Sequence, residues 1–170
     1  MDFSMQHTSL TKEIESFNYK NPYRQFNVNN SLWERHLKEI DLQVSQFMKE
    51  IAGKQRSHKH EINQFFNYIN NNPALGKRGA TVIGSLFWLF IIARSLNPKI
   101  IVESGVFLGS SLHCYREACK NADIFGFDLN LKNLLFQDES IHLHETDWSQ
   151  IEIKAKTAND LCYFDDHINN

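Results

Sequence analysis

Residues 103–111, ESGVFLGSS, decide the fold, because they join an apolar run to a helical pattern through a turn that carries two glycines. The run at residues 99–103 predicts a strand, and residues 110–121 predict a helix. Gly105 and Gly109 allow positive φ and let a ligand approach the bare backbone, while Ser110 or Ser111 can cap the helix. A strand, a glycine turn and a helix in this order predict the first unit of an α/β domain.

The same alternation continues towards the C-terminus. Short apolar runs at residues 123–128, 141–145 and 161–165 predict three more strands, and a weak helical pattern covers residues 131–136. Right-handed crossovers between such strands give a parallel sheet whose carboxyl ends share one edge, and open α/β sheets bind ligands at that edge. We therefore predict a parallel α/β sheet with about four recognisable strands and a ligand site at its carboxyl edge.

The most apolar stretch of the chain precedes the first strand, at residues 80–93, ATVIGSLFWLFIIA. It is flanked by Arg78 and Arg94 and is shorter than the roughly 18–20 residues needed to cross a bilayer. We predict a buried helix over residues 80–96, ended by Asn97-Pro98, and no membrane span.

Residues 31–75 are predicted to form a helical N-terminal extension. From Ser31, a candidate N-cap with Glu34 completing a capping box, apolar residues recur at steps of three and four, which predicts an amphipathic helix ending near Gly53. A second stripe predicts a helix over residues 60–70. Packing or oligomer contact is the expected role of both helices, and a lid that covers a substrate is the alternative. Residues 1–30 show no sustained period and are predicted to be an irregular arm.

Composition narrows the class of partner. The 170 residues contain 18 Lys and Arg, 20 Asp and Glu and 42% hydrophobic residues, which suits one globular core. A formal net charge of −2 lacks the basic excess typical of proteins that bind nucleic acid or anionic membranes, so neither partner is expected. Three cysteines without paired spacing and the lack of a signal-peptide pattern predict a cytoplasmic protein with reduced thiols.

Three predicted strands end in residues suited to one nucleoside. Glu103 closes the first strand, Asp128 closes the second and is placed to accept hydrogen bonds from ribose hydroxyls, and Asp147-Trp148 follow the third, near an adenine. A dinucleotide is disfavoured, because Glu103 stands where the G-x-G-x-x-G fingerprint needs its first glycine and would repel a pyrophosphate. A nucleoside with a cationic centre and no phosphate suits this acidic edge better.

From about residue 76 to the C-terminus, the chain resembles the class I S-adenosylmethionine-dependent methyltransferases. The resemblance rests on VESGVFLGSS at residues 102–111, IFGFDLN at 124–130, HETDWS at 144–149 and LCYFDDH at 161–167. It implies a Rossmann-like domain over residues 76–170 with S-adenosylmethionine as cofactor. The cofactor-binding residues that it implies are Glu103, Gly105, Gly109, Ser110, Asp128, Asp147 and Trp148. Residues 76–79, GKRG, look like the loop that touches the cofactor carboxylate in related enzymes.

The fourth predicted strand ends in Asp165, Asp166 and His167, where the methyl group would meet its acceptor. Asp165 and Asp166 could bind Mg²⁺ and so lower the pKa of an acceptor hydroxyl, or either could orient His167 as a general base. The motif is similar to the metal-bearing strand end of catechol-type O-methyltransferases, which implies O-methylation of a small molecule. A solvated acidic loop is the alternative interpretation.

The chain departs from the family in its length. Family members carry about seven strands, whereas this sequence stops five residues after Asp165, so the expected sheet is incomplete. The fourth strand, residues 161–164, is then expected to be an exposed apolar edge that invites a second copy or a partner chain. Whether the chain is an active enzyme stays open. The alternative is a non-catalytic, methyltransferase-like remnant that acts as a binding or regulatory module through this edge.

Overall fold

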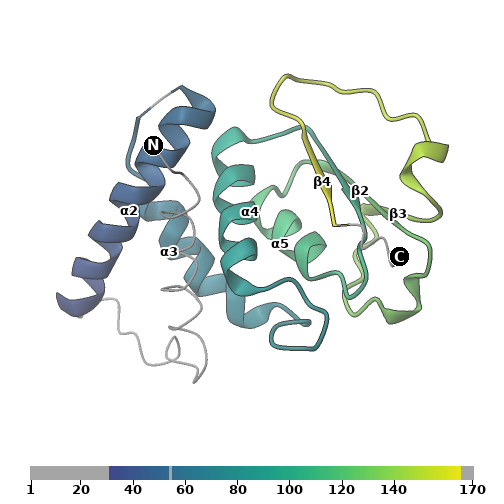
Figure 1. The fold of residues 1–170 in the computed structure, drawn as a ribbon, viewed down its shortest axis with the longest axis horizontal. Helices are drawn as coiled ribbons and strands as arrows, with labels where there is room; N and C mark the ends of the chain where they lie inside the picture. The colour runs from purple at the N-terminus through teal and green to yellow at the C-terminus, as the bar shows by residue number, and fades with distance from the viewer. Residues whose placement is uncertain (1–30, 54, 166–170) are drawn as a thin grey trace.

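The computed structural model describes residues 31–53 and 55–165 and shows helices packed on one side of a sheet (Figure 1). The predicted arm at residues 1–30 and the predicted site residues Asp166 and His167 lie outside the described residues. In chain order the elements are α2 (Ser31–Ala52), α3 (Lys59–Tyr68), η2 (Ile69–Asn71), α4 (Ile83–Leu96), β1 (Ile100–Ser104), α5 (Ser110–Ala118), β2 (Asp123–Asp128), η3 (Leu131–Asn133), β3 (Ile141–Glu145), η4 (Trp148–Gln150) and β4 (Leu161–Phe164).

The four strands run parallel in the order β3-β2-β1-β4, which confirms the predicted α/β, Rossmann-like sheet. Ser104 of β1 stands level with Phe127 of β2 and Phe164 of β4, so the carboxyl ends of these strands lie together. The chain passes from β1 through β2 to β3 and then returns across β1 to β4. The strand order therefore reverses beside β1, where open α/β sheets bind ligands.

Helices α4 and α5 cover one face of the sheet, and α2 and α3 lie beyond them (Figure 1). One core cluster runs from Trp33 in α2 through Phe65 in α3 and Phe87 in α4 to Ile124 in β2. The N-terminal helices therefore share a continuous apolar core with the sheet. On the opposite face of the sheet a smaller cluster contains Ile100, Val102 and Phe127, with Phe125, Ile151 and Ile153 packed against it.

The buried helix α4 begins at Ile83, three residues later than predicted. Val82 is extended, with φ −65° and ψ 151°, and the Thr81 N–H donates to Ser110 Oγ at 3.0 Å, so this backbone is tied to α5 before the helix begins. Asn97 ends the helix in the left-handed conformation, at φ 48°. Among the described residues no helix is both long enough and apolar enough to cross a membrane.

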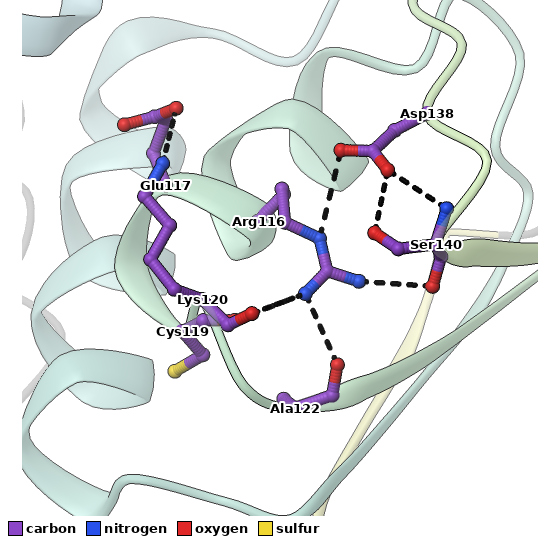
Figure 2. Close-up of polar contacts among 7 residues, drawn as sticks. All are labelled: Arg116, Glu117, Cys119, Lys120, Ala122, Asp138 and Ser140. Carbon is purple, nitrogen blue, oxygen red and sulfur yellow. Dashed lines mark hydrogen bonds and ion pairs between the residues drawn. The ribbon is translucent and has the colours of Figure 1, made fainter.

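Helix α5 ends at Ala118, earlier than the predicted residue 121, and Arg116 organises the turn that follows it (Figure 2). The Arg116 Nη1 donates to the carbonyl oxygens of Lys120 and Ala122 at 3.0 and 3.1 Å, and Nη2 donates to Ser140 O at 3.1 Å. These bonds connect the end of α5 with the start of β2 and with the turn before β3.

The predicted helix over residues 131–136 is wrong. Only η3 (Leu131–Asn133) is helical there, and Leu134 is extended at φ −62° and ψ 124°. The Leu135 N–H instead donates to Leu108 O at 3.1 Å, and the Leu134 side chain packs against Gly109. Packing on the glycine turn therefore outweighs the helical pattern of this segment.

Candidate ligand site at the carboxyl edge of the sheet

The glycine turn after β1 places three left-handed residues at alternate positions. Gly105, Phe107 and Gly109 have φ of 88°, 45° and 77°. This conformation suits glycine but strains Phe107, at a cost of about 1 kcal/mol. The Phe107 N–H donates to Asp128 Oδ2 at 2.8 Å, which holds the turn against the end of β2.

Two glycines near this turn are needed for close packing. A Cβ on Gly79 would lie 2.4 Å from Cε1 of Phe107, so the Phe107 ring rests on the loop at residues 76–79. A Cβ on Gly109 would lie 2.6 Å from Cδ1 of Leu134. The predicted loop at residues 76–79 therefore meets the glycine turn, and Leu134 fills the space that Gly109 leaves.

Glu103 lies inside the fold at the carboxyl end of β1, with 0% of its surface exposed. Its Oε1 accepts a hydrogen bond from Ser111 Oγ on α5, while its Oε2 has no hydrogen-bond partner. Burial raises the pKa of Glu103 to about 8, the hydrogen bond from Ser111 opposes this rise, and the nearby carboxylates of Asp165 and Asp128 add to it. At neutral pH this carboxyl group is therefore mostly protonated.

Asp128 faces the turn from the end of β2. Its Oδ2 accepts the Phe107 N–H at 2.8 Å, and its Oδ1 accepts the Asn130 N–H at 2.9 Å. Each carboxylate oxygen can accept a second hydrogen bond. Asp128 therefore retains capacity to accept further hydrogen bonds, and its predicted role at ribose hydroxyls stays a prediction.

Asp165 follows β4 and continues its pairing, because its N–H donates to Ser104 O at 2.9 Å. Its carboxylate raises the pKa of Glu103 and, after burial, contributes to raising the pKa of Tyr163 to about 12. Carboxyl groups from the ends of β1, β2 and β4 thus influence one another electrostatically. We call Glu103, Asp128 and Asp165 the strand-end acids.

Asp147 and Trp148 lie at the start of η4, after β3. Asp147 Oδ1 accepts the Ser149 N–H at 2.8 Å and caps η4, and the hydrogen bonds from Ser149 lower the pKa of this exposed carboxyl. Trp148 is 42% exposed and meets Phe164 edge-on, with ring centroids 5.0 Å apart. Asp147 is not among the charges that shift the pKa of Glu103. The indole lies beside the end of β4, and the predicted role of both residues at an adenine stays a prediction.

Ser110 holds the loop before α4. It is 3% exposed, its Oγ accepts the Thr81 N–H at 3.0 Å, and its carbonyl accepts from Asn72 Nδ2 at 2.9 Å. Neither Ser110 nor Ser111 caps α5, whose N-cap residue is Gly109 without a side-chain hydrogen bond. The capping role predicted for these serines is therefore wrong, because both side chains bond to other elements.

Two contributions to the site were missed at the sequence level. Ser111 bonds to Glu103, and Phe107 occupies a left-handed position between two glycines. The left-handed position of Phe107 had a signal in the sequence, because the E-x-G-x-F-x-G pattern places Phe107 two residues from each glycine. The hydrogen bond from Ser111 to Glu103 depends on the contact between α5 and β1, which sequence spacing alone does not reveal.

The metal prediction rests on Asp165 and Asp166, of which the structure describes only Asp165. Within residues 31–53 and 55–165, no group of three or more His, Cys, Asp or Glu is arranged to hold a metal ion. A groove of about 650 Å³ lies elsewhere, between α2 and the segment before α3, with Lys38, Asp41 and Arg56 in its lining. Its mixed charges are separate from the strand-end acids.

Neither a scan against protein-family models nor a search of curated proteins finds a match. A search of solved structures finds similarity to the S-adenosylhomocysteine-bound methyltransferase PaMTH1 of Podospora anserina, with a TM-score of 0.43 and 15% identity. The match covers 61% of this chain and 50% of PaMTH1, so the chain spans about half the length of that methyltransferase.

Proposed function

We propose that this chain binds S-adenosylmethionine at the strand-end acids and transfers its methyl group to an oxygen of a small molecule. The observation that carries the proposal is the unpartnered Oε2 of the fully buried Glu103, beside Asp128 and Asp165. A buried carboxyl oxygen without a partner is costly, and a ligand that donates to it or carries positive charge offsets that cost.

The charge of the site favours a cationic ligand. No Lys, Arg or His is among the charges that shift the pKa of Glu103. The carboxylates of Asp128 and Asp165 would repel a phosphate placed beside Glu103. S-adenosylmethionine has no phosphate, carries a sulfonium and an ammonium group, and offers ribose hydroxyls to Asp128, so the residues present fit this ligand.

The bound cofactor would supply an electrophilic methyl group for in-line displacement. The chain would contribute by holding donor and acceptor aligned and away from water. Asp165, with Asp166 and His167 next to it in the sequence, would accept the acceptor hydroxyl's proton or bind Mg²⁺ beside it.

A second candidate function is a non-catalytic binding module. The specific observation in its favour is the edge strand β4, which pairs only with β1 among the described residues and exposes Cys162 and 49% of Phe164. Such an edge can pair with another chain. The two functions differ in their need for a methyl acceptor.

Isothermal titration calorimetry with S-adenosylmethionine and S-adenosylhomocysteine tests cofactor binding. Asp128→Ala should weaken binding at least about tenfold, because two ribose hydroxyls lose their acceptor. Asp123→Ala is the matched control, since Asp123 lies at the opposite end of the same strand and pairs with Lys156. No binding of either ligand by the unmodified chain would refute the proposal, and equal losses in both variants would remove Asp128 from the site.

Methyl transfer to small phenols and catechols, measured with and without Mg²⁺, separates the enzyme from the module. An enzyme should lose turnover on Asp166→Asn without losing cofactor affinity, whereas Asp165→Asn changes one of the strand-end acids and should lower both. Cofactor binding with no turnover on any acceptor would favour the binding module.

A further inference from the structure

Burial and neighbouring charge disfavour the charged form of Glu103, and only the hydrogen bond from Ser111 favours it. Its carboxyl group is fully buried, and its one hydrogen-bond donor is the neutral Ser111 hydroxyl. Asp128 from β2 and Asp165 from beyond β4 add negative charge nearby. A carboxyl group in such surroundings keeps its proton above its usual range.

The titratable groups that face Glu103 come from three elements. They are Cys114 and Tyr115 on α5, Asp128 at the end of β2, and Tyr163 and Asp165 on and after β4. Each of these groups is neutral or negative when it titrates, so none of them offsets a negative charge on Glu103. Within the described residues, a positive charge at this position must therefore come from a ligand.

A cationic ligand would reverse this balance. Positive charge beside Glu103 Oε2 stabilises the carboxylate, and the same oxygen can then accept a hydrogen bond from the ligand. Resting on the proposed function, we propose that Glu103 gives up its proton when the cationic ligand enters, so that binding exchanges a proton for the charge of the ligand. The O–H bond of the Glu103 carboxyl breaks, its electron pair stays on the carboxylate, and the proton passes to the buffer.

This exchange predicts how many protons leave on binding. With a pKa of about 8, the Glu103 carboxyl is about nine-tenths protonated at pH 7. Binding near neutral pH should therefore release close to one proton per ligand. The affinity for the ligand should rise with pH up to about 8, because a smaller fraction of Glu103 then carries a proton that binding must displace. Above that pH the affinity should level off.

Calorimetry of the full chain with S-adenosylmethionine, in buffers of different ionisation enthalpy at one pH, counts these protons. The observed binding enthalpy should vary linearly with the buffer ionisation enthalpy, with a slope near one proton released at pH 7 and near zero above pH 9. Glu103→Gln keeps the shape of the side chain, so it should still bind but lose this slope. Subtracting the slope of this variant from that of the unmodified chain also removes any proton exchanged by the ligand itself.

Ser111→Ala provides a second variant that leaves Glu103 in place. Removing the hydrogen bond that favours the carboxylate should move the proton release to higher pH. Binding by the unmodified chain without buffer dependence, or an equal slope in Glu103→Gln, would overturn the inference while leaving the proposed function intact. No binding of S-adenosylmethionine at all would overturn both.

Discussion

A buried acid with a raised pKa makes the stability of the fold depend on pH. The pKa of Glu103 rises from 4.5 to about 8 in the folded protein, first because of burial. Between these values the folded state binds more protons than the unfolded state, so stability falls as pH rises across this window and levels off above about 8.

Glu103→Gln should remove this loss. We expect the variant to match the unmodified protein near pH 5 and to exceed its unfolding free energy at pH 9 by about 2–4 kcal/mol, because the unfavourable buried charge is gone. Urea denaturation from pH 5 to 9 measures the difference. Glu152→Gln is the control on an exposed acid and should show no such trend. A constant difference between the two proteins at every pH would contradict the assigned charge state.

Phe107 provides a second test at the residue scale. Its φ of 45° favours glycine, whereas alanine would keep the strain and lose the ring. Phe107→Gly should therefore be more stable than Phe107→Ala by about 1 kcal/mol, the reverse of the order found inside helices. Thermal unfolding of the two variants decides the matter, and an alanine variant at least as stable as the glycine variant would show that the turn relaxes.

At the scale of elements, one side chain links three segments. Arg116 is 8% exposed and donates to carbonyl groups that follow α5 and precede β3 (Figure 2). Lysine keeps the charge but lacks the planar fork of donors. Arg116→Lys should therefore lower the unfolding free energy by about 2–3 kcal/mol, since several buried carbonyls lose a charged donor.

Lys120→Gln is the control for this prediction. It removes the neighbouring ion pair with Glu117, whose atoms are 2.7 Å apart near the surface, and should cost no more than about 0.5 kcal/mol. Chemical denaturation compares both variants. Equal, small losses would mean that the contacts of Arg116 do not hold these segments together.

The helices and strands also show which parts of the fold the sequence pattern could predict. The succession of strands along the chain and the apolar helix follow from periodicity, because burial on a sheet or helix face imposes a fixed spacing. The helix predicted over residues 131–136 was wrong, because Leu134 packs on the glycine turn and the backbone of Leu135 bonds to it. A local sequence pattern carries no information about such a contact. Glu103, Asp128 and Asp165 were predictable as strand ends. Their electrostatic coupling and the orphaned Oε2 needed the strand order.

At the scale of the whole molecule, the sheet is covered unevenly. Helices cover the face that carries Ile101 and Ile124, while Cys162 and Phe164 on β4 are exposed. We propose that β4 pairs with a second copy or with a partner chain.

Cys162→Lys tests this edge. Cys162 stands level with Val102 but has an exposed side chain, so lysine there should leave the core intact while opposing strand pairing. Sedimentation equilibrium should find self-association of the unmodified chain and a shift towards monomer in the variant. A monomeric unmodified chain at every concentration would leave only the partner-chain form of the proposal.

The location of the ligand site is the claim on which the proposed chemistry depends. Amide chemical shifts of the isotopically labelled chain, recorded during titration with S-adenosylhomocysteine, report that location residue by residue. The account predicts saturable changes concentrated at residues 103–111 and at Asp128 and Asp165. Changes confined to the groove that contains Lys38 and Arg56, or no saturable change anywhere, would contradict it.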